Sequence, residues 1–181
     1  SHLILENSEL ISGQNYSENS EVNKILNDEN YYSVMLYPGR QSIDLTPLNT
    51  EDRQVLFPQN KQLAVFVIDG TWATARKMVS QSMNLASLPR ICFTPPRPSQ
   101  FRVRKQPHPL CYSTIEAIHH TIELIGDSQT FSVMSREHDK LLKVFDFMVE
   151  RQLFFIQESL LNSRTSTYRK PNSRNLLVPV L

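Results

Sequence analysis

The sequence predicts an α/β domain with a mainly parallel sheet flanked by helices. Short runs of branched and aromatic residues alternate with segments of helical periodicity along the chain. The clearest run, LAVFVI at residues 63–68, is apolar throughout, which is typical of a strand at the centre of a parallel sheet. A length of 181 residues suits one domain with its own core. Residues 1–181 are therefore expected to form a single domain, with a basic irregular tail at residues 162–181.

The amino-terminal half predicts two helices and three strands. Residues 20–27 are expected to form a helix capped by Ser20, with Glu21 in its first turn. Residues 31–37 form an aromatic and branched strand, and residues 53–57 a possible short strand before Pro58. Residues 71–82 follow the central strand as a helix, because their alanines and methionine favour helical backbone.

The carboxyl-terminal half is expected to add a short strand at residues 90–93 and a proline-rich loop at residues 95–109. Residues 101–104 within that loop form a possible strand. Residues 113–125 form a helix that ends at Gly126. A last helix runs from about residue 135 to residue 157. Its apolar stripe comprises Leu141, Leu142, Phe145, Met148, Val149, Leu153 and Phe154.

The amino-acid composition indicates a folded domain and argues against membrane and disulfide-rich proteins. Hydrophobic residues make up 40% and charged residues 20% of the chain, as expected of a folded soluble domain. No apolar run is long enough for a membrane span, and glutamates interrupt the first residues where a signal peptide would be apolar. The two cysteines, Cys92 and Cys111, make neither a metal quartet nor a disulfide framework. We therefore expect no membrane partner and, from the cysteine content, a reducing, cytoplasmic location. His119 and His120 lack metal-ligand spacing, and we expect no metal.

Charge is distributed unevenly, although the formal net charge is only +1. Residues 1–30 carry six acidic residues against one lysine, whereas residues 70–115 and 159–181 carry no acidic residue. Such a distribution favours a polyanion such as RNA as partner. The alternative is that these are scattered solubilising charges. The basic residues of the two acid-free stretches are Arg76, Lys77, Arg90, Arg97, Arg102, Arg104, Lys105, Arg164, Arg169, Lys170 and Arg174.

The segment Asp69-Gly70-Thr71-Trp72 stands where the central strand gives way to a helix. Ligands of open α/β sheets bind at the carboxyl ends of strands, and helix N-termini favour anions. Asp69 and Thr71 are therefore candidates to hold a charged ligand. The alternative is structural: both residues cap the helix, and Trp72 fills the core.

Three further segments could contribute to the same site. Arg102 and Arg104 in SQFRVRKQ would share one face of a strand, or would protect an exposed edge from aggregation. Ser113 and Glu116 in CYSTIEA have the spacing of a capping box, which explains them without a function. The segment LYPGR at residues 36–40 could surround a small ligand with its backbone, or could simply be a loop.

Four separated blocks, VFVIDGTWATARKM, LPRICF, FRVRK and YSTIEA, together resemble the DTW-domain family of tRNA-uridine aminocarboxypropyltransferases. The resemblance covers residues 31–125. It implies a SPOUT-like fold with a C-terminal trefoil knot. Members of the family usually carry paired cysteines near the N-terminus, and this sequence lacks them. Either the segment that bears them is missing from this sequence or this member has no such metal site.

The resemblance implies transfer of the 3-amino-3-carboxypropyl group of S-adenosylmethionine to N3 of a uridine in the tRNA variable loop. A non-catalytic RNA-binding domain and an S-adenosylmethionine-dependent RNA methyltransferase remain as alternatives. A monomer is favoured, although the sequence leaves both the oligomeric state and the choice of tRNA open. The expected catalytic residues are Asp69, Thr71 and Trp72. The expected donor-binding residues are Leu36, Tyr37, Pro38, Gly39, Asp69, Gly70, Ser113, Thr114 and Glu116. The expected RNA-binding residues are Arg76, Arg102, Arg104, Lys105, Arg169, Lys170 and Arg174.

Overall fold

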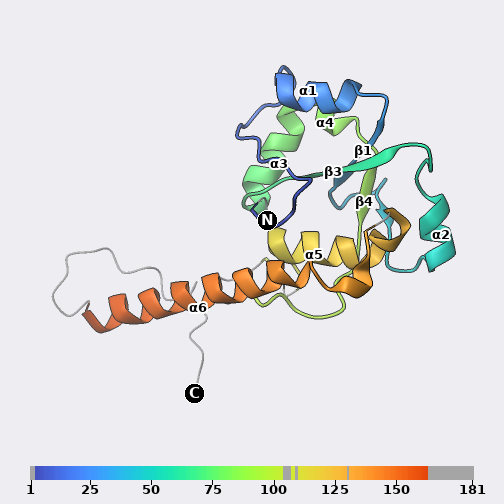
Figure 1. The fold of residues 1–181 in the computed structure, drawn as a ribbon. Coiled ribbons are helices and arrows are strands. Elements are labelled where there is room, and N and C mark those ends of the chain that lie inside the picture. Colours follow the sequence, from blue (N-terminus) through green and yellow to red (C-terminus); the bar gives the residue numbers. More distant parts are fainter. Residues whose placement is uncertain (1–2, 104–106, 109, 130, 163–181) are drawn as a thin grey trace.

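The computed structural model describes residues 3–103, 107–108, 110–129 and 131–162. Its centre is a four-stranded sheet with the strand order β2-β4-β1-β3 (Figure 1). The strands are β1 (Tyr31–Leu36), β2 (Ile43–Asp44), β3 (Gln62–Val67) and β4 (Arg90–Cys92). All three strand pairs are parallel. The expected α/β architecture with a parallel sheet is therefore confirmed.

Helices flank this sheet. They are α1 (Ser20–Asn27), α2 (Thr50–Val55), α3 (Trp72–Gln81), α4 (Met83–Ala86), α5 (Thr114–Ile125) and α6 (Asp139–Asn162), with single 3-10 turns at Asp127–Gln129 and Val133–Ser135. The helices expected at residues 20–27, 71–82 and 113–125 are confirmed to within one residue. The cap of α1 is Asn19 rather than Ser20, because the Asn19 side chain accepts the hydrogen bond from the Val22 backbone.

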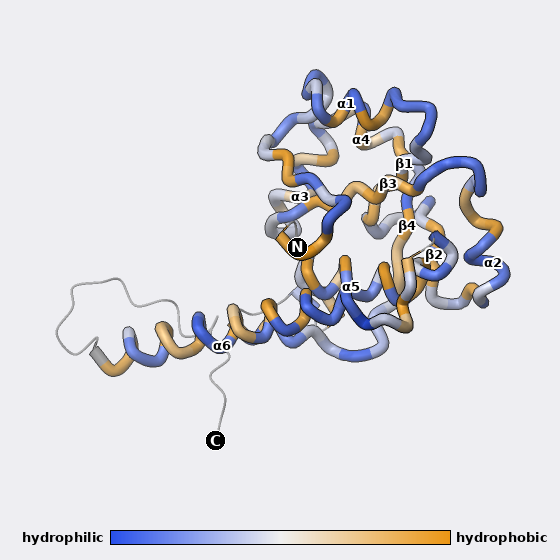
Figure 2. The backbone as a smooth tube through the Cα atoms, in the orientation of Figure 1, coloured by the Kyte–Doolittle hydropathy of each residue, from blue (hydrophilic) through white to orange (hydrophobic). Residues whose placement is uncertain are grey.

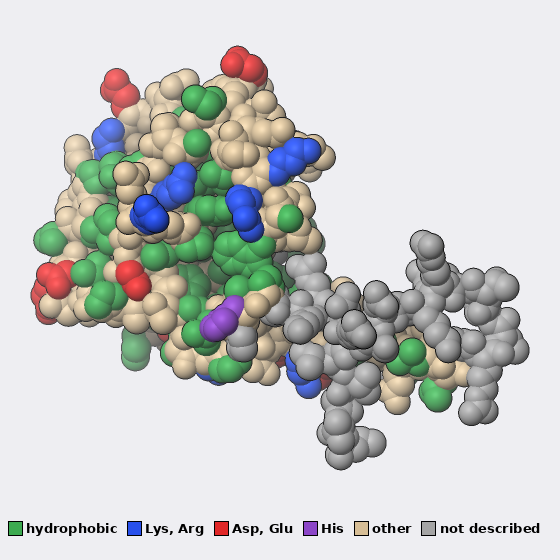
Figure 3. Space-filling model, turned by 180° about the vertical axis from the view of Figure 1, so that it is seen from behind, with side chains coloured by type: hydrophobic (Ala, Val, Ile, Leu, Met, Phe, Trp, Pro, Cys, Tyr) green, Lys and Arg blue, Asp and Glu red, His purple; other side chains and the backbone are tan. Residues whose placement is uncertain are grey.

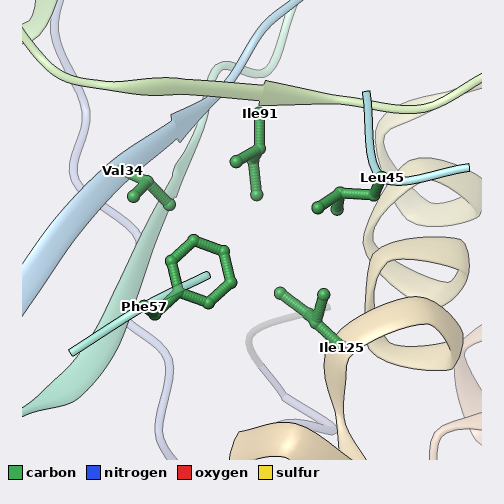
Figure 4. Close-up of a cluster of buried hydrophobic side chains, with 5 residues drawn as sticks. All are labelled: Val34, Leu45, Phe57, Ile91 and Ile125. Atoms are coloured by element: carbon green, nitrogen blue, oxygen red, sulfur yellow. The ribbon is translucent and has the colours of Figure 1, made fainter. Parts of the chain in front are cut away.

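One face of the sheet packs against α2 and α5. Val34 of β1 and Ile91 of β4 meet Leu45, Phe57 and Ile125 in a buried cluster (Figure 4). Each of these five residues is at most 4% exposed. Side chains of a strand alternate between its two faces. Alternate residues of the two strands accordingly join this cluster: Tyr32, Val34 and Leu36 of β1, and Leu63 and Val65 of β3.

The opposite face carries α1, α3 and α4. Tyr16, Val22, Met78 and Leu85 form its buried cluster, and Phe66 of β3 packs against them. Phe66 lies between Val65 and Val67 in the strand, and Val65 contacts the first cluster. The apolar run of residues 63–68 is thus explained by packing on both faces, as in a parallel strand between helical layers. The expectation that this strand lies at the centre of the sheet is wrong, because β3 is the edge strand and β1 lies between it and β4.

Two expected strands are wrong. Residues 53–57 include the end of α2, whose first turn is capped by Asn49 through a hydrogen bond from the Asp52 backbone. An Asn cap followed by acidic residues stabilises a helix start, and this signal outweighs the β-propensity of Val55 and Phe57. Residues 101–103 form a turn in which the Arg102 backbone N–H donates to the Gln100 carbonyl. Arg104, the last residue of that expected strand, lies outside the described residues.

Helix α6 packs its first half on α5 and then projects away from the rest of the domain (Figure 1). It begins later than expected, at Asp139, and continues to Asn162. Leu141, Phe145 and Val149 face the body and are almost fully buried. Hydrophobic residues also mark the projecting half (Figure 2). The basic tail beyond Asn162 and the expected trefoil knot lie outside the described residues.

Among the described residues, the helices are all too short or too polar to cross a membrane.

Candidate functional site

The carboxyl edge of β3 carries Asp69, Gly70 and Thr71 in an exposed turn. Gly70 has a φ of +152°, a backbone conformation that residues with a side chain rarely adopt. Thr71 is the N-cap of α3, because its side chain accepts a hydrogen bond of 3.2 Å from the Thr74 backbone. The expected capping role of Thr71 is confirmed. Asp69 takes no part in this cap and is directed elsewhere.

Asp69 contacts the start of α5. The hydroxyl of Thr114 donates a hydrogen bond to Asp69 Oδ1, with an oxygen–oxygen distance of 2.6 Å. Thr114 is the first residue of α5, and Ser113 is the cap of that helix. Two of the expected segments, DGTW and CYSTIEA, therefore meet at one edge of the sheet.

Glu116 is buried behind this contact, with 7% of its surface exposed. Its carboxylate accepts hydrogen bonds from the Ser113 backbone at 2.9 Å and hydroxyl at 2.8 Å, which completes the expected capping box. The same carboxylate accepts from the Ser99 hydroxyl and the Gln100 backbone, both at 2.7 Å. Glu116 thus ties the proline-rich loop to the start of α5, a contact that the sequence did not reveal.

Trp72 lies at the rim of this edge rather than in the core. It is 37% exposed, and its ring contacts that of Tyr37 at a centroid distance of 6.4 Å. The interpretation that Trp72 fills the core is therefore wrong. Tyr37 follows β1, and Trp72 follows β3, so the contact between their rings joins the ends of these two strands. The Tyr37 carbonyl also accepts a hydrogen bond of 2.8 Å from the Ser42 hydroxyl.

Arg90, in the block LPRICF, is a further residue at this rim, and it is not among the residues expected to form the site. Its guanidinium lies 5.5 Å from the centre of the Tyr37 ring, within the range of a cation–π interaction. A Cβ atom on Gly39 would stand 3.4 Å from Arg90 Nη1, so the loop backbone passes close to this cation. The only signal in the sequence is that Arg90 opens a strand in an acid-free stretch.

The expected donor-binding residues after β1 share this edge. Leu36 and Tyr37 are half-buried, whereas Pro38 and Gly39 are exposed. The backbone hydrogen bonds between β1 and β4 continue one residue beyond the end of β1, because the Tyr37 N–H donates to the Ile91 carbonyl at 3.0 Å. The loop at residues 36–40 therefore starts beside β4 and faces the same rim as Trp72.

Basic residues expected to bind RNA are only partly described. Arg76 on α3 and Arg102 in the loop are both exposed. Several basic side chains surround hydrophobic ones on the face of the molecule opposite to the view of Figure 1 (Figure 3). The remaining expected contacts, Arg104, Lys105, Arg169, Lys170 and Arg174, lie outside the described residues.

A cleft of about 350 Å³ lies away from this edge, beside Tyr31 and Tyr32 at the beginning of β1 and close to α1 and α4. A second hollow of about 300 Å³ follows α3 along Thr74, Lys77 and Gln81. In open parallel sheets the ligand side is the carboxyl edge, so we assign the candidate site to the open rim at Asp69 rather than to the cleft beside Tyr31.

A second polar cluster joins α5 to the start of α6. One ligand atom from each of His119, Glu123, His138 and Asp139 lies within 4.8 Å of the other three. His138 Nε2 is 2.6 Å from Glu123 Oε1, and His119 Nε2 is 2.8 Å from Asp139 Oδ1. These are the lengths of direct hydrogen bonds, shorter than the spacing of about 3.3 Å between ligands that each stand ~2 Å from a zinc ion.

Arg136 contributes a positive charge to that cluster. Its guanidinium contacts Glu123 at 2.5 Å and Asp139 at 2.7 Å. The hydrogen bond from Arg136, followed by that from His119, lowers the pKa of Asp139 to about 2. Burial opposes ionisation of Glu123, but the hydrogen bond from His138 and the charge of Arg136 hold its pKa below the usual value. We therefore interpret the cluster as an ion-pair network that fixes α6 on α5.

Comparison with known families gives one result. The family model of the DTW domain matches residues 1–153 of the chain. This match includes Asp69, Thr114 and the network between α5 and α6. No solved structure matches the chain.

Proposed function

The chain belongs to the DTW-domain family, and on that premise we propose that it transfers the 3-amino-3-carboxypropyl group of S-adenosylmethionine to N3 of a uridine in the tRNA variable loop. Membership of the family indicates a tRNA-modifying enzyme. The observation that carries the finer proposal is the hydrogen bond between Thr114 and Asp69. It joins two of the four blocks that carry the family resemblance and restrains an exposed carboxylate at the carboxyl end of β3, where ligands of open parallel sheets bind.

The residues around Asp69 suit the chemical groups of such a donor. Asp69 offers an exposed carboxylate for an ammonium or sulfonium charge. Trp72, which is 37% exposed, and the half-buried Tyr37 beside it offer ring surface against which a purine could stack. The guanidinium of Arg90 stands at the same rim and can pair with a carboxylate. The carboxylate, the two rings and the cation of the protein thus match the ammonium, the adenine and the carboxylate of the donor, in that order.

The reaction forms one bond and breaks another at the same carbon. When bound, S-adenosylmethionine supplies an electrophilic carbon next to its sulfonium and a neutral thioether, methylthioadenosine, as leaving group. The uridine N3 loses its proton and forms the new N–C bond, and the electrons of the C–S bond move to sulfur. The protein has to present this carbon, rather than the methyl group, to N3, which is a task of orientation.

Asp69 is the proposed acceptor of the N3 proton. Thr114 donates its hydroxyl hydrogen to Oδ1 and so restrains the position of this carboxylate. A second role for Asp69 is compatible with this geometry, namely binding the ammonium group of the donor. Thr71 and the first turn of α3 would favour a phosphate or carboxylate through their backbone N–H groups.

RNA would approach the basic side chains of residues 70–115, a stretch that carries no acidic residue. Arg76 stands one turn into α3, next to the proposed site, and Arg102 lies in the loop that Glu116 ties to α5. Side chains of this type contact phosphates and position the nucleic acid without reading its sequence. A cytoplasmic location and a SPOUT-like topology remain predictions.

The proposal is tested with purified protein, S-adenosylmethionine and unmodified tRNA, followed by mass analysis of the nucleosides. The expected result is an aminocarboxypropyl-uridine together with an equal amount of methylthioadenosine. A methylated nucleoside would instead identify a methyltransferase. Unchanged tRNA that still binds the protein would identify a non-catalytic RNA-binding domain, and either outcome would overturn the proposal.

A further inference from the structure

The projecting helix α6 carries a stripe of large hydrophobic side chains that face solvent. The residues of this stripe, which are between 50% and 71% exposed, are Val144, Phe147, Phe154, Phe155 and Leu161. They lie on a different side of the helix from Leu141, Phe145 and Val149, which are buried against the body. Contiguous exposed apolar surface of this kind marks an interaction site.

The spacing of the stripe is that of a coiled coil. Residues 144, 147, 151, 154, 158 and 161 are separated alternately by three and four positions, which is the a/d pattern of a heptad repeat. Four of these six positions are apolar, and two are charged: Arg151 and Glu158. The pattern spans about five helical turns. It therefore predicts pairing with another helix along one narrow seam.

The two charged positions indicate which partner helix would fit this seam. Arg151 stays on the seam, because its guanidinium lies 5.0 Å from the Phe155 ring centre and 6.0 Å from that of Phe154. A parallel pair of identical helices would bring Arg151 against Arg151 and Glu158 against Glu158. An antiparallel pair instead places each Arg151 within about one turn of the other copy's Glu158. The seam is thus complementary in charge to itself only when it is reversed.

We propose that α6 is the interface of an antiparallel homodimer, in which the stripe residues of two copies pack together and Arg151 pairs with Glu158 of the second copy. The two-fold symmetry makes both ion pairs at once. Such a dimer replaces the expectation of a monomer and does not depend on the proposed function. Arg151 and Glu158 fix the direction of pairing, as polar residues at core positions do in coiled coils.

Sedimentation equilibrium of the full chain tests this proposal. The wild type is expected to weigh twice its 21.0 kDa. R151E and E158R each bring like charges together and should weaken the dimer by at least about tenfold. The double variant R151E/E158R restores opposite charges and should recover most of the affinity. D146R changes charge on the exposed side of α6 outside the stripe and serves as the matched control.

Other outcomes overturn the proposal. A monomer at all concentrations would show that the stripe is covered by residues 163–181 or by a different protein. A dimer that is insensitive to both single charge reversals would place the interface elsewhere. A dimer that the double variant fails to restore would exclude the antiparallel register. Circular dichroism and melting temperatures of all variants ensure that a lost dimer is not a lost fold.

Discussion

Thr114 donates its hydroxyl hydrogen to Asp69 across 45 positions of sequence, at an oxygen–oxygen distance of 2.6 Å. Asp69 follows the end of the edge strand β3, and Thr114 begins helix α5. The contact therefore fixes the position of an exposed carboxylate relative to both elements. Each residue alone has an ordinary structural explanation, and only their meeting makes a candidate site.

Removal of the Thr114 hydroxyl should impair turnover more than binding. T114V keeps the shape of the side chain but frees Asp69, and a hydrogen bond to a charged group is worth roughly 1.5–3 kcal/mol. The expected loss in kcat is therefore about tenfold to a hundredfold, with little change in KM for either substrate. T114S should recover most of the rate. Near-normal turnover in T114V together with a loss in T114S would show that the methyl group, rather than the hydroxyl, matters.

Replacement of Asp69 by Asn should abolish most of the activity and leave the fold intact. The amide keeps the size of the carboxylate but cannot accept the N3 proton, so single-turnover rates should fall by about a hundredfold or more. Asp69 is exposed, so the melting temperature should change little. Near-normal turnover in D69N would refute the catalytic role.

Trp72 and Phe145 should respond differently to truncation. Trp72 is 37% exposed whereas Phe145 is 1% exposed. F145A leaves a buried cavity and should cost roughly 3–5 kcal/mol of stability, while W72A should cost only about 1–2 kcal/mol. W72A should nevertheless reduce donor affinity, which calorimetry with S-adenosylmethionine can measure. A loss of stability in W72A as large as that in F145A would contradict the placement of Trp72 at the rim.

Acid should detach α6 through the ion-pair network. The pKa of Asp139 falls from 3.8 to about 2 in the folded state. A lowered folded pKa means that the carboxylate stabilises the fold above its unfolded pKa, and that this contribution disappears as the pH falls toward 2. R136Q removes the largest cause of the shift, so its acid-unfolding midpoint should move upward. Circular dichroism measured against pH gives this midpoint. If the midpoint of R136Q equals that of the wild type, Arg136 does not stabilise the ionised Asp139.

Salt should weaken tRNA binding, because phosphate contacts release counterions. The exposed pair R76Q/R102Q should reduce both the affinity and the dependence of affinity on salt concentration. K24Q, on α1 within the acidic amino-terminal stretch, is the matched control and should behave as the wild type. Filter binding at several salt concentrations measures both effects. Wild-type behaviour of R76Q/R102Q would exclude these two residues from the RNA-binding surface.

Strong local patterns predicted most of the fold. The strands at residues 31–37 and 63–68 and the helix at residues 113–125 carry continuous apolar or capped periodic signals, and all three are confirmed. β2 has only two residues, too few for any pattern. The error at residues 53–57 arose because Val55 and Phe57 were given more weight than the acidic first turn of α2.

The candidate site was predictable in its parts but not in its assembly. The strand end at Asp69 and the capping box at Ser113 are local features that the sequence displays. Their contact depends on how α5 lies on the sheet, which no spacing encodes. The ties from Glu116 to Ser99 and Gln100 and the position of Arg90 over Tyr37 were missed for the same reason. Burial of Glu116 could be found only once the loop was placed.

The strand order also determines how the chain can fold during synthesis. The central strand β1 pairs on one side with β3 and on the other with β4. As the chain leaves the ribosome, β1 and β3 can pair first, but the second edge of β1 stays open until Cys92 has emerged. An open, apolar strand edge is a template for aggregation. The nascent protein is therefore most vulnerable between the synthesis of β3 and that of β4, when a chaperone would be of most use.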